Sequence, residues 1–119
     1  MKGQSPYLKK KSYQEAEKAF FAICCFDPSH FVYWVGLAHS SFQNNHYEQA
    51  IDAYSIASGM DPENIWPHIW AANCFEAVKD SEHACMALSE ALSLEKAKKS
   101  PDREMVHSLE MRLQENKKK

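Results

Sequence analysis

Glycine is scarce in this sequence, and long apolar runs are missing. The 119 residues include three glycines, and none of these opens a phosphate-binding loop. No apolar run approaches the roughly 20 residues that span a bilayer, and the first residues lead into no apolar signal region. No nucleophile stands beside a base at a spacing typical of a catalytic motif. The sequence therefore predicts a protein that is not an enzyme, does not insert into membranes and resides in the cytosol.

An excess of positive charge is also missing. Fourteen basic residues face sixteen acidic ones, which gives a formal net charge of -2. Such a chain has no electrostatic footprint for nucleic acid or for an anionic membrane, and we expect neither as a partner. The hydrophobic content of 45% is enough to build a packed core. We expect residues 1–119 to form a single domain.

Cysteine and histidine are present without the spacing of a metal site. The four cysteines stand at positions 24, 25, 74 and 85, with no Cys-x-x-Cys, and no two histidines share one helical face. Two disulfide bridges are possible by number, but the cysteines lie in apolar segments with helical patterning. The sequence predicts reduced, packed thiols, no metal and no cofactor.

A pattern repeats in the sequence with a period of 34 residues. Asp27-Pro28 returns as Asp61-Pro62, and Tyr13, Ala16 and Phe20 return as Tyr47, Ala50 and Tyr54. A period of this size is typical of stacked helical hairpins, and the pattern resembles the tetratricopeptide repeat. The repeated alanines predict sites where two helices approach closely. The fold class expected is all-α, a right-handed solenoid of about two and a half hairpins with a C-terminal capping helix.

The 34-residue register sets the expected boundaries. The second half of repeat 1 covers 12–28, with Ser12 as the helix N-cap, and its first half falls before Met1, so the chain is expected to be N-terminally shortened. The remaining parts follow in order: repeat 2 at 31–62, repeat 3 at 65–95, the capping helix at 100–116 opened by Ser100 and Pro101, and a disordered tail at 117–119.

The first helix of each hairpin is expected to line the inner face of the curved stack. Positions not used for packing within a hairpin are the candidate peptide-binding residues, and most of them are apolar. These candidates are Leu8, Val32, Val35, His39, Phe42, Trp66, Ile69 and Asn73. Apolar members would hold anchors of an extended peptide, and His39 and Asn73 would bond its backbone. The alternative is that these side chains pack against a neighbouring helix or a preceding segment.

A grip on a partner's C-terminal carboxylate is disfavoured. That use of the scaffold requires cations on the inner face. Val35 and Ile69 occupy the corresponding positions here.

From about Ser12 to Asn116 the chain resembles the tetratricopeptide-repeat chaperones of bacterial type III secretion, the class II chaperones that serve pore-forming translocators. The resemblance rests on the segments at 13–16, 20–27, 33–38 and 47–54, on Ala71 to Cys74 leading to Ala84, and on the single long helix after them.

The resemblance implies a cytoplasmic bacterial chaperone that binds an extended segment of a translocator or other secreted client in its concave groove. Binding would prevent premature association or degradation before secretion. Leu8, Phe42 and Ile69 match the positions of the family's anchor pockets. The family's additional N-terminal helix, often used for homodimerisation, has no counterpart, which leaves a homodimer open.

Two other functions stay open from the sequence. In the first, the chain would be a chaperone whose client is a gatekeeper-type regulator of secretion. In the other, the chain would be an adaptor or scaffold that joins folded proteins through its convex face, around Tyr54 and His83. We also expect the chain alone to be marginally stable or self-associating, because two and a half repeats bury little and the face around Phe21 and Ile23 stays open.

Overall fold

Six helices make up the part of the chain that the structure describes. The structure is a computed structural model that describes the backbone of residues 6–119 and the side chains of residues 10–119. The helices are α1 (Pro6–Phe26), α2 (Phe31–Gln43), α3 (Tyr47–Met60), α4 (Trp66–Ala77), α5 (Ser81–Lys96) and α6 (Arg103–Lys117).

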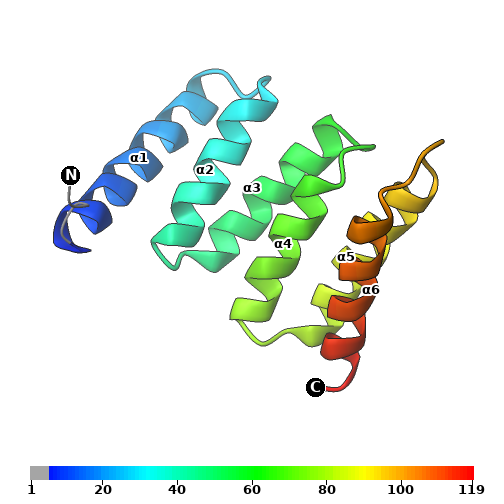
Figure 1. Cartoon of the computed structure of the whole chain (residues 1–119). Helices are drawn as coiled ribbons and strands as arrows, with labels where there is room; N and C mark the ends of the chain where they lie inside the picture. Colours follow the sequence, from blue (N-terminus) through cyan, green and yellow to red (C-terminus); the bar gives the residue numbers. More distant parts are fainter. Residues whose placement is uncertain (1–5) are drawn as a thin grey trace, which may run out of the picture.

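The helices form a sequential stack. Each helix packs against the next one along the chain, and successive helices run in opposite directions (Figure 1). The hairpins α2–α3 and α4–α5 are the two complete repeats, and α6 closes the C-terminal end against α5. The all-helical stack and the capping helix predicted from the sequence are confirmed.

The first and last helices begin at other residues than predicted. α1 starts at Pro6, so Ser12 lies inside the helix and is not its N-cap. Proline suits the first turn of a helix, and the lysines that follow are good helix formers, which explains the earlier start. α6 starts at Arg103, and the Asp102 carboxylate accepts from the backbone N–H groups of Glu104 and Met105. Ser100 and Pro101 therefore precede the helix, and Lys117 is its last residue.

Buried alanines lie at the contacts between the helices of each hairpin. Ala50 and Ala84, which the repeat register singled out, are both completely buried. The first core cluster joins α1 to α4 through Cys24, Leu37, Tyr54, Cys74 and three alanines. The second joins α4, α5 and α6, where Leu109 and Leu113 cover Ile69 and Leu88. Capping by α6 thus completes the second core.

The thiols are unpaired, and three of them are packed. Cys24 and Cys74 are buried and Cys85 is half-buried, whereas Cys25 is exposed, against the expectation that all four pack. Burial raises the pKa of the Cys74 thiol to about 11, so this thiol stays protonated at neutral pH. Among the described residues, no helix is both long and apolar enough to cross a bilayer.

Candidate functional site

The candidate binding surface lies on α2 and α4 and is called the inner face below. It comprises Val32, Val35, His39 and Phe42 from α2 with Trp66, Trp70 and Asn73 from α4. Val32 is 68% exposed and Trp66 is 45% exposed, while Val35 and Phe42 are half-buried. Large apolar side chains that are exposed together in one patch mark a candidate contact surface for a partner.

An aromatic cluster joins the two helices of the inner face. The His39 ring lies 4.6 Å from the Trp70 ring, and Trp70 lies 6.0 Å from Trp66. Nδ1 of His39 is within hydrogen-bonding distance of the Tyr54 hydroxyl. Desolvation lowers the pKa of His39, which favours the neutral imidazole, and Nε2 is the ring nitrogen not engaged with Tyr54.

Two candidate residues lie beside α6. Ile69 is only 7% exposed because it lies in the second core with Leu109 and Leu113. The Asn73 side-chain oxygen accepts from Nη2 of Arg112 at 2.8 Å. Ile69 is therefore buried and not open to a groove as expected, whereas Asn73 is half-buried with its side-chain oxygen bonded to α6.

The remaining candidate, Leu8, falls within the backbone of α1, but its side chain lies outside the described residues. Sequence reasoning also missed Trp70 and Arg112. Trp70 had a signal, because it stands one helical turn after Trp66 and so shares its face. Arg112 had none, because α6 lies outside the repeat register.

Charge is nearly absent from the inner face. α2 contains no Lys, Arg, Asp or Glu. On α4 the carboxylate of Glu76 is the one acidic group, and it forms an ion pair with Arg112 at 2.9 Å. The inner face therefore suits an uncharged apolar segment and offers no free cation for a carboxylate.

Solved structures of other proteins share this fold. A type III secretion complex from Aeromonas hydrophila matches at 26% identity and a TM-score of 0.79, covering 91% of this chain and 71% of that one. The Yersinia enterocolitica secretion chaperone SycD, in complex with a peptide of the translocator YopD, matches at 25% identity and a TM-score of 0.77, covering 92% and 83%.

The chain has the fold of the class II type III secretion chaperones. PcrH of Pseudomonas aeruginosa, in complex with the chaperone-binding region of PopD, has the same fold at 23% identity, with a TM-score of 0.79 and coverage of 93% and 83%. The resemblance found in the sequence is thereby confirmed. The solved SycD structures are those of a type III secretion translocator chaperone. No protein-family model matches the chain, and no curated protein matches its sequence.

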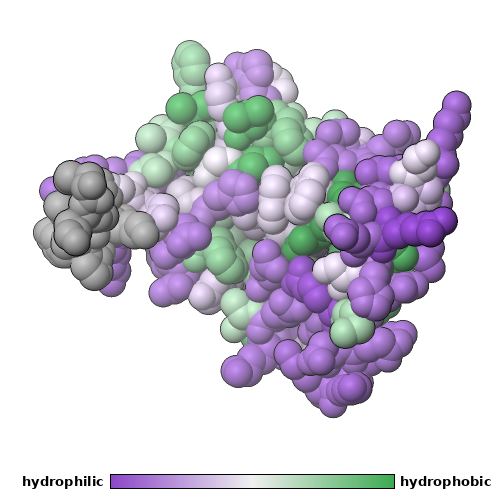
Figure 2. Space-filling view, viewed as in Figure 1, coloured by the Kyte–Doolittle hydropathy of each residue, from purple (hydrophilic) through white to green (hydrophobic). Residues whose placement is uncertain are grey.

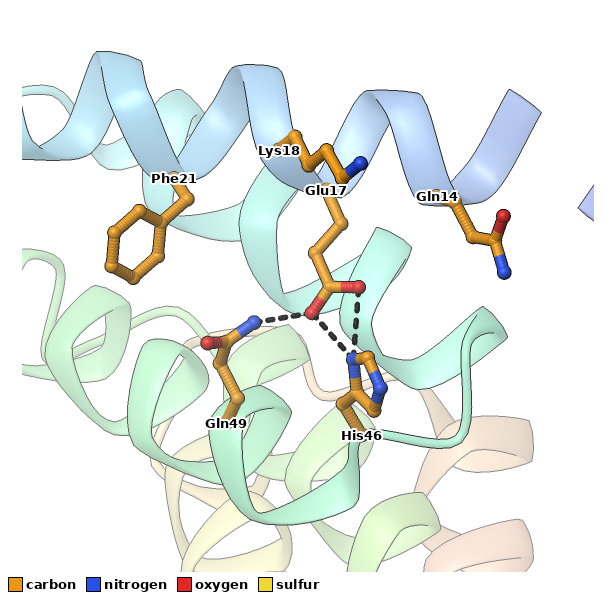
Figure 3. Close-up of a pocket in the computed structure, with 6 residues that line it drawn as sticks. All are labelled: Gln14, Glu17, Lys18, Phe21, His46 and Gln49. Carbon is orange, nitrogen blue, oxygen red and sulfur yellow. Dashed lines mark hydrogen bonds and ion pairs between the residues drawn. The ribbon is translucent and has the colours of Figure 1, made fainter. Parts of the chain in front are cut away.

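In this chaperone fold a buried carboxylate fixes α1 to the first complete hairpin. Glu17 is 8% exposed, and its oxygens accept from Ser41 Oγ at 3.0 Å and from Asn44 Nδ2 at 2.6 Å. Nδ1 of His46 lies 2.8 Å from the same carboxylate, and Gln49 donates to it (Figure 3). Burial by itself raises the pKa of Glu17, but the hydrogen bonds from His46, Asn44 and Ser41 outweigh it and hold the pKa below its ordinary value.

The Glu17 network borders a hollow of about 560 Å³ between α1 and α3, lined also by Lys18 and Phe21. Glu17, His46 and Gln49 bond one another at this hollow, so these three side chains position α1. Among the described residues no group of three potential metal ligands occurs.

Proposed function

We propose that the chain binds an extended apolar segment of a secreted translocator on its inner face, in the bacterial cytoplasm. The observation that carries the proposal is the likeness to SycD crystallised with a peptide of YopD, over nearly the whole of this chain. The exposed Val32 and Trp66 supply the apolar surface that such a segment would cover.

Burial of apolar side chains would drive this binding. Each Å² of apolar surface removed from water stabilises a complex by about 25 cal/mol. Val32, Val35 and Phe42 follow one face of α2, and Trp66 continues this surface onto α4. The ring of His39 on α2 contacts Trp70 of α4, and because His39 is exposed its free ring nitrogen can bond a peptide backbone.

The contacts of α6 with α4 limit the extent of the site. Because Ile69 is buried beside α6 and Asn73 bonds Arg112, the segment would be held mainly by α2 and by Trp66 and Trp70 of α4. A segment held in this way is shielded from other copies and from proteases, which would keep the client from association or degradation before secretion.

A capture experiment tests the proposal. The chain is used as bait in lysate of the host bacterium beside Val32→Glu, and Met111→Glu on α6 serves as the control, because both side chains are exposed, at 68% and 55%. Circular dichroism confirms that each variant is folded. We expect a secreted client, held through a short protease-protected segment, that is lost with Val32→Glu and kept with Met111→Glu.

Two outcomes would favour the alternatives. Recovery of folded cytoplasmic proteins unaffected by Val32→Glu would support an adaptor. Recovery of a secretion regulator in place of a translocator, through the same segment-binding mode, would support a chaperone of a gatekeeper-type client.

A further inference from the structure

A second surface of the chain has the features of a docking site, and it lies away from the inner face. A hollow of about 380 Å³ runs between α3 and α5 and is called the outer groove below. Its floor is α4, since both flanking helices pack on that helix. Ser55 and Ser58 of α3, Ala71 and Phe75 of α4, and Met86 and Glu90 of α5 are among its lining residues.

The outer groove is flanked by two helices that both pack on a third. Packed helices lie about 8–10 Å apart, so two helices on either side of a third leave a channel that admits one more helix above it. The small side chains of Ser55, Ser58 and Ala71 let a helix backbone approach closely. Met86 is 62% exposed and offers a flexible apolar contact beside the Phe75 ring.

Acidic residues predominate in the segment that forms the outer groove. From Asn44 to Glu95 the sequence has nine acidic residues and a single basic one, Lys79, although the whole chain is nearly balanced. α3 contains Glu48 and Asp52 and no lysine or arginine. On α5 the residues Glu82, Met86 and Glu90 follow one another at every fourth position, which makes a stripe of carboxylate, thioether and carboxylate along one face.

These carboxylates are available to a partner. Glu48, Asp52, Glu82 and Glu90 are all exposed, and none of them forms an ion pair with another described residue. Two histidines also border the groove, His68 from its floor and His83 from its rim. His68 Nε2 lies 3.1 Å from Ser58 Oγ, and the His83 ring stacks on Phe75, so both already have neighbours within the chain.

We propose that the outer groove docks a basic amphipathic helix of a partner protein. Its apolar face would lie on Met86, Phe75 and Ala71. Its lysine or arginine side chains would reach Glu90, which lines the groove, and Glu82, which lies on the same face of α5 as Met86. An extended apolar segment, as proposed for the inner face, makes no use of this acidic border. The two surfaces would therefore bind different parts of a client or two different proteins.

A pair of synthetic peptides tests the proposal. Both are helical and 18 residues long, one with leucine on one face and lysine on the other, and the second with glutamate replacing every lysine. Titration into the isotope-labelled full chain is followed by amide NMR shifts. We expect the lysine peptide to shift amides around Ser55, Ala71 and Met86 and to bind more weakly as salt rises. We expect the glutamate peptide to give no such shifts.

Matched variants locate the binding. Ser55→Trp fills the groove from an exposed serine, and Ser108→Trp on α6 is its control, because Ser108 is also exposed in a helix. The double variant Glu82→Gln and Glu90→Gln removes the charges, with Glu104→Gln and Glu115→Gln on α6 as its control. We expect Ser55→Trp to abolish the shifts and the charge variant to weaken binding about tenfold, with both controls unchanged.

Three results would overturn the proposal. The first is equal binding of both peptides, and the second is shifts confined to Val32, Val35 and Trp66 on the inner face. The third is unaltered binding to a folded Ser55→Trp variant. None of these results bears on the capture of a secreted client through Val32, so the two proposals stand or fall separately.

Discussion

The carboxylate of Glu17 on α1 lies 2.8 Å from Nδ1 of His46, at the start of α3, 29 residues along the chain. Ser41, Asn44 and Gln49 donate to the same carboxylate. α1 is therefore tied by one buried side chain to both helices of the following hairpin. The inner face depends on this tie, because α1 and α2 share the first core.

Replacing Glu17 is expected to loosen α1. Glu17→Gln keeps the size of the side chain but loses the charge and places an amide N–H₂ among donors, so we expect a loss of about 1–3 kcal/mol in the free energy of unfolding. Urea unfolding measures it. Glu15→Gln, at an exposed position of the same helix, is the control and should change stability by less than about 0.5 kcal/mol. Equal effects of the two variants would contradict a special role for Glu17.

The same network makes stability depend on pH in the acid range. The pKa of Glu17 in the folded chain is below its ordinary value, so the unfolded chain binds the proton more readily. The contribution of Glu17 is fully present above the unfolded-state pKa of about 4.3 and is lost as pH falls through the lower folded-state pKa. We expect Glu17→Gln to flatten the fall in the free energy of unfolding between about pH 5 and pH 3. A slope equal to that of the unaltered chain would contradict this.

Two glycines provide a matched test of how α1 packs. A Cβ on Gly36 of α2 would overlap the Phe20 ring of α1, whereas a Cβ on Gly59 of α3 meets no atom within 4 Å. We expect Gly36→Ala to cost about 1–3 kcal/mol through overpacking and Gly59→Ala to gain about 0.5–1 kcal/mol through helix propensity. Thermal and urea unfolding report both. Stabilisation by Gly36→Ala would mean that α1 does not pack against α2 as described.

Client binding is expected to stabilise the chain. The chain exposes hydrophobic surface that a client could cover. Such surface is visible in Figure 2 near the turn between α1 and α2, where Phe26 is 91% exposed. A ligand that binds only the folded state at a hundred times its Kd adds about 2.7 kcal/mol to the free energy of unfolding. We expect the melting temperature to rise with a saturating peptide from the client's protected segment. No rise would contradict binding to the folded chain by that segment.

The sequence predicted the parts of the fold that the 34-residue period encodes. Ala50 and Ala84 are buried because each lies where two helices of a hairpin touch, and that requirement returns in every repeat. Ile69 was placed on an open face because the register treats all inner positions alike, whereas α6 packs on this one. The start of α1 was missed because the register assigned Leu8 to a preceding helix and Ser12 to the N-cap of the next, whereas one helix runs through both positions.

The Glu17 network could not be read from the sequence in advance. Its members come from α1, α2, the turn after α2 and α3, and no periodic pattern links them. The low charge of the inner face was partly predicted, since Val35 and Ile69 stand at positions where binding of a carboxylate would require cations. The pairing of Glu76 with Arg112 required the position of α6.

The central claim is that the client segment lies on α2 and α4. The most direct measurement is the change in amide NMR shifts of the isotope-labelled chain when the client's protected segment is added, at low and at high salt. We expect the shifts to gather at Val32, Val35, His39 and Trp66, with an affinity nearly independent of salt because this face has almost no charge. Shifts confined to α3 and α5, or an affinity that falls steeply with salt, would contradict the account.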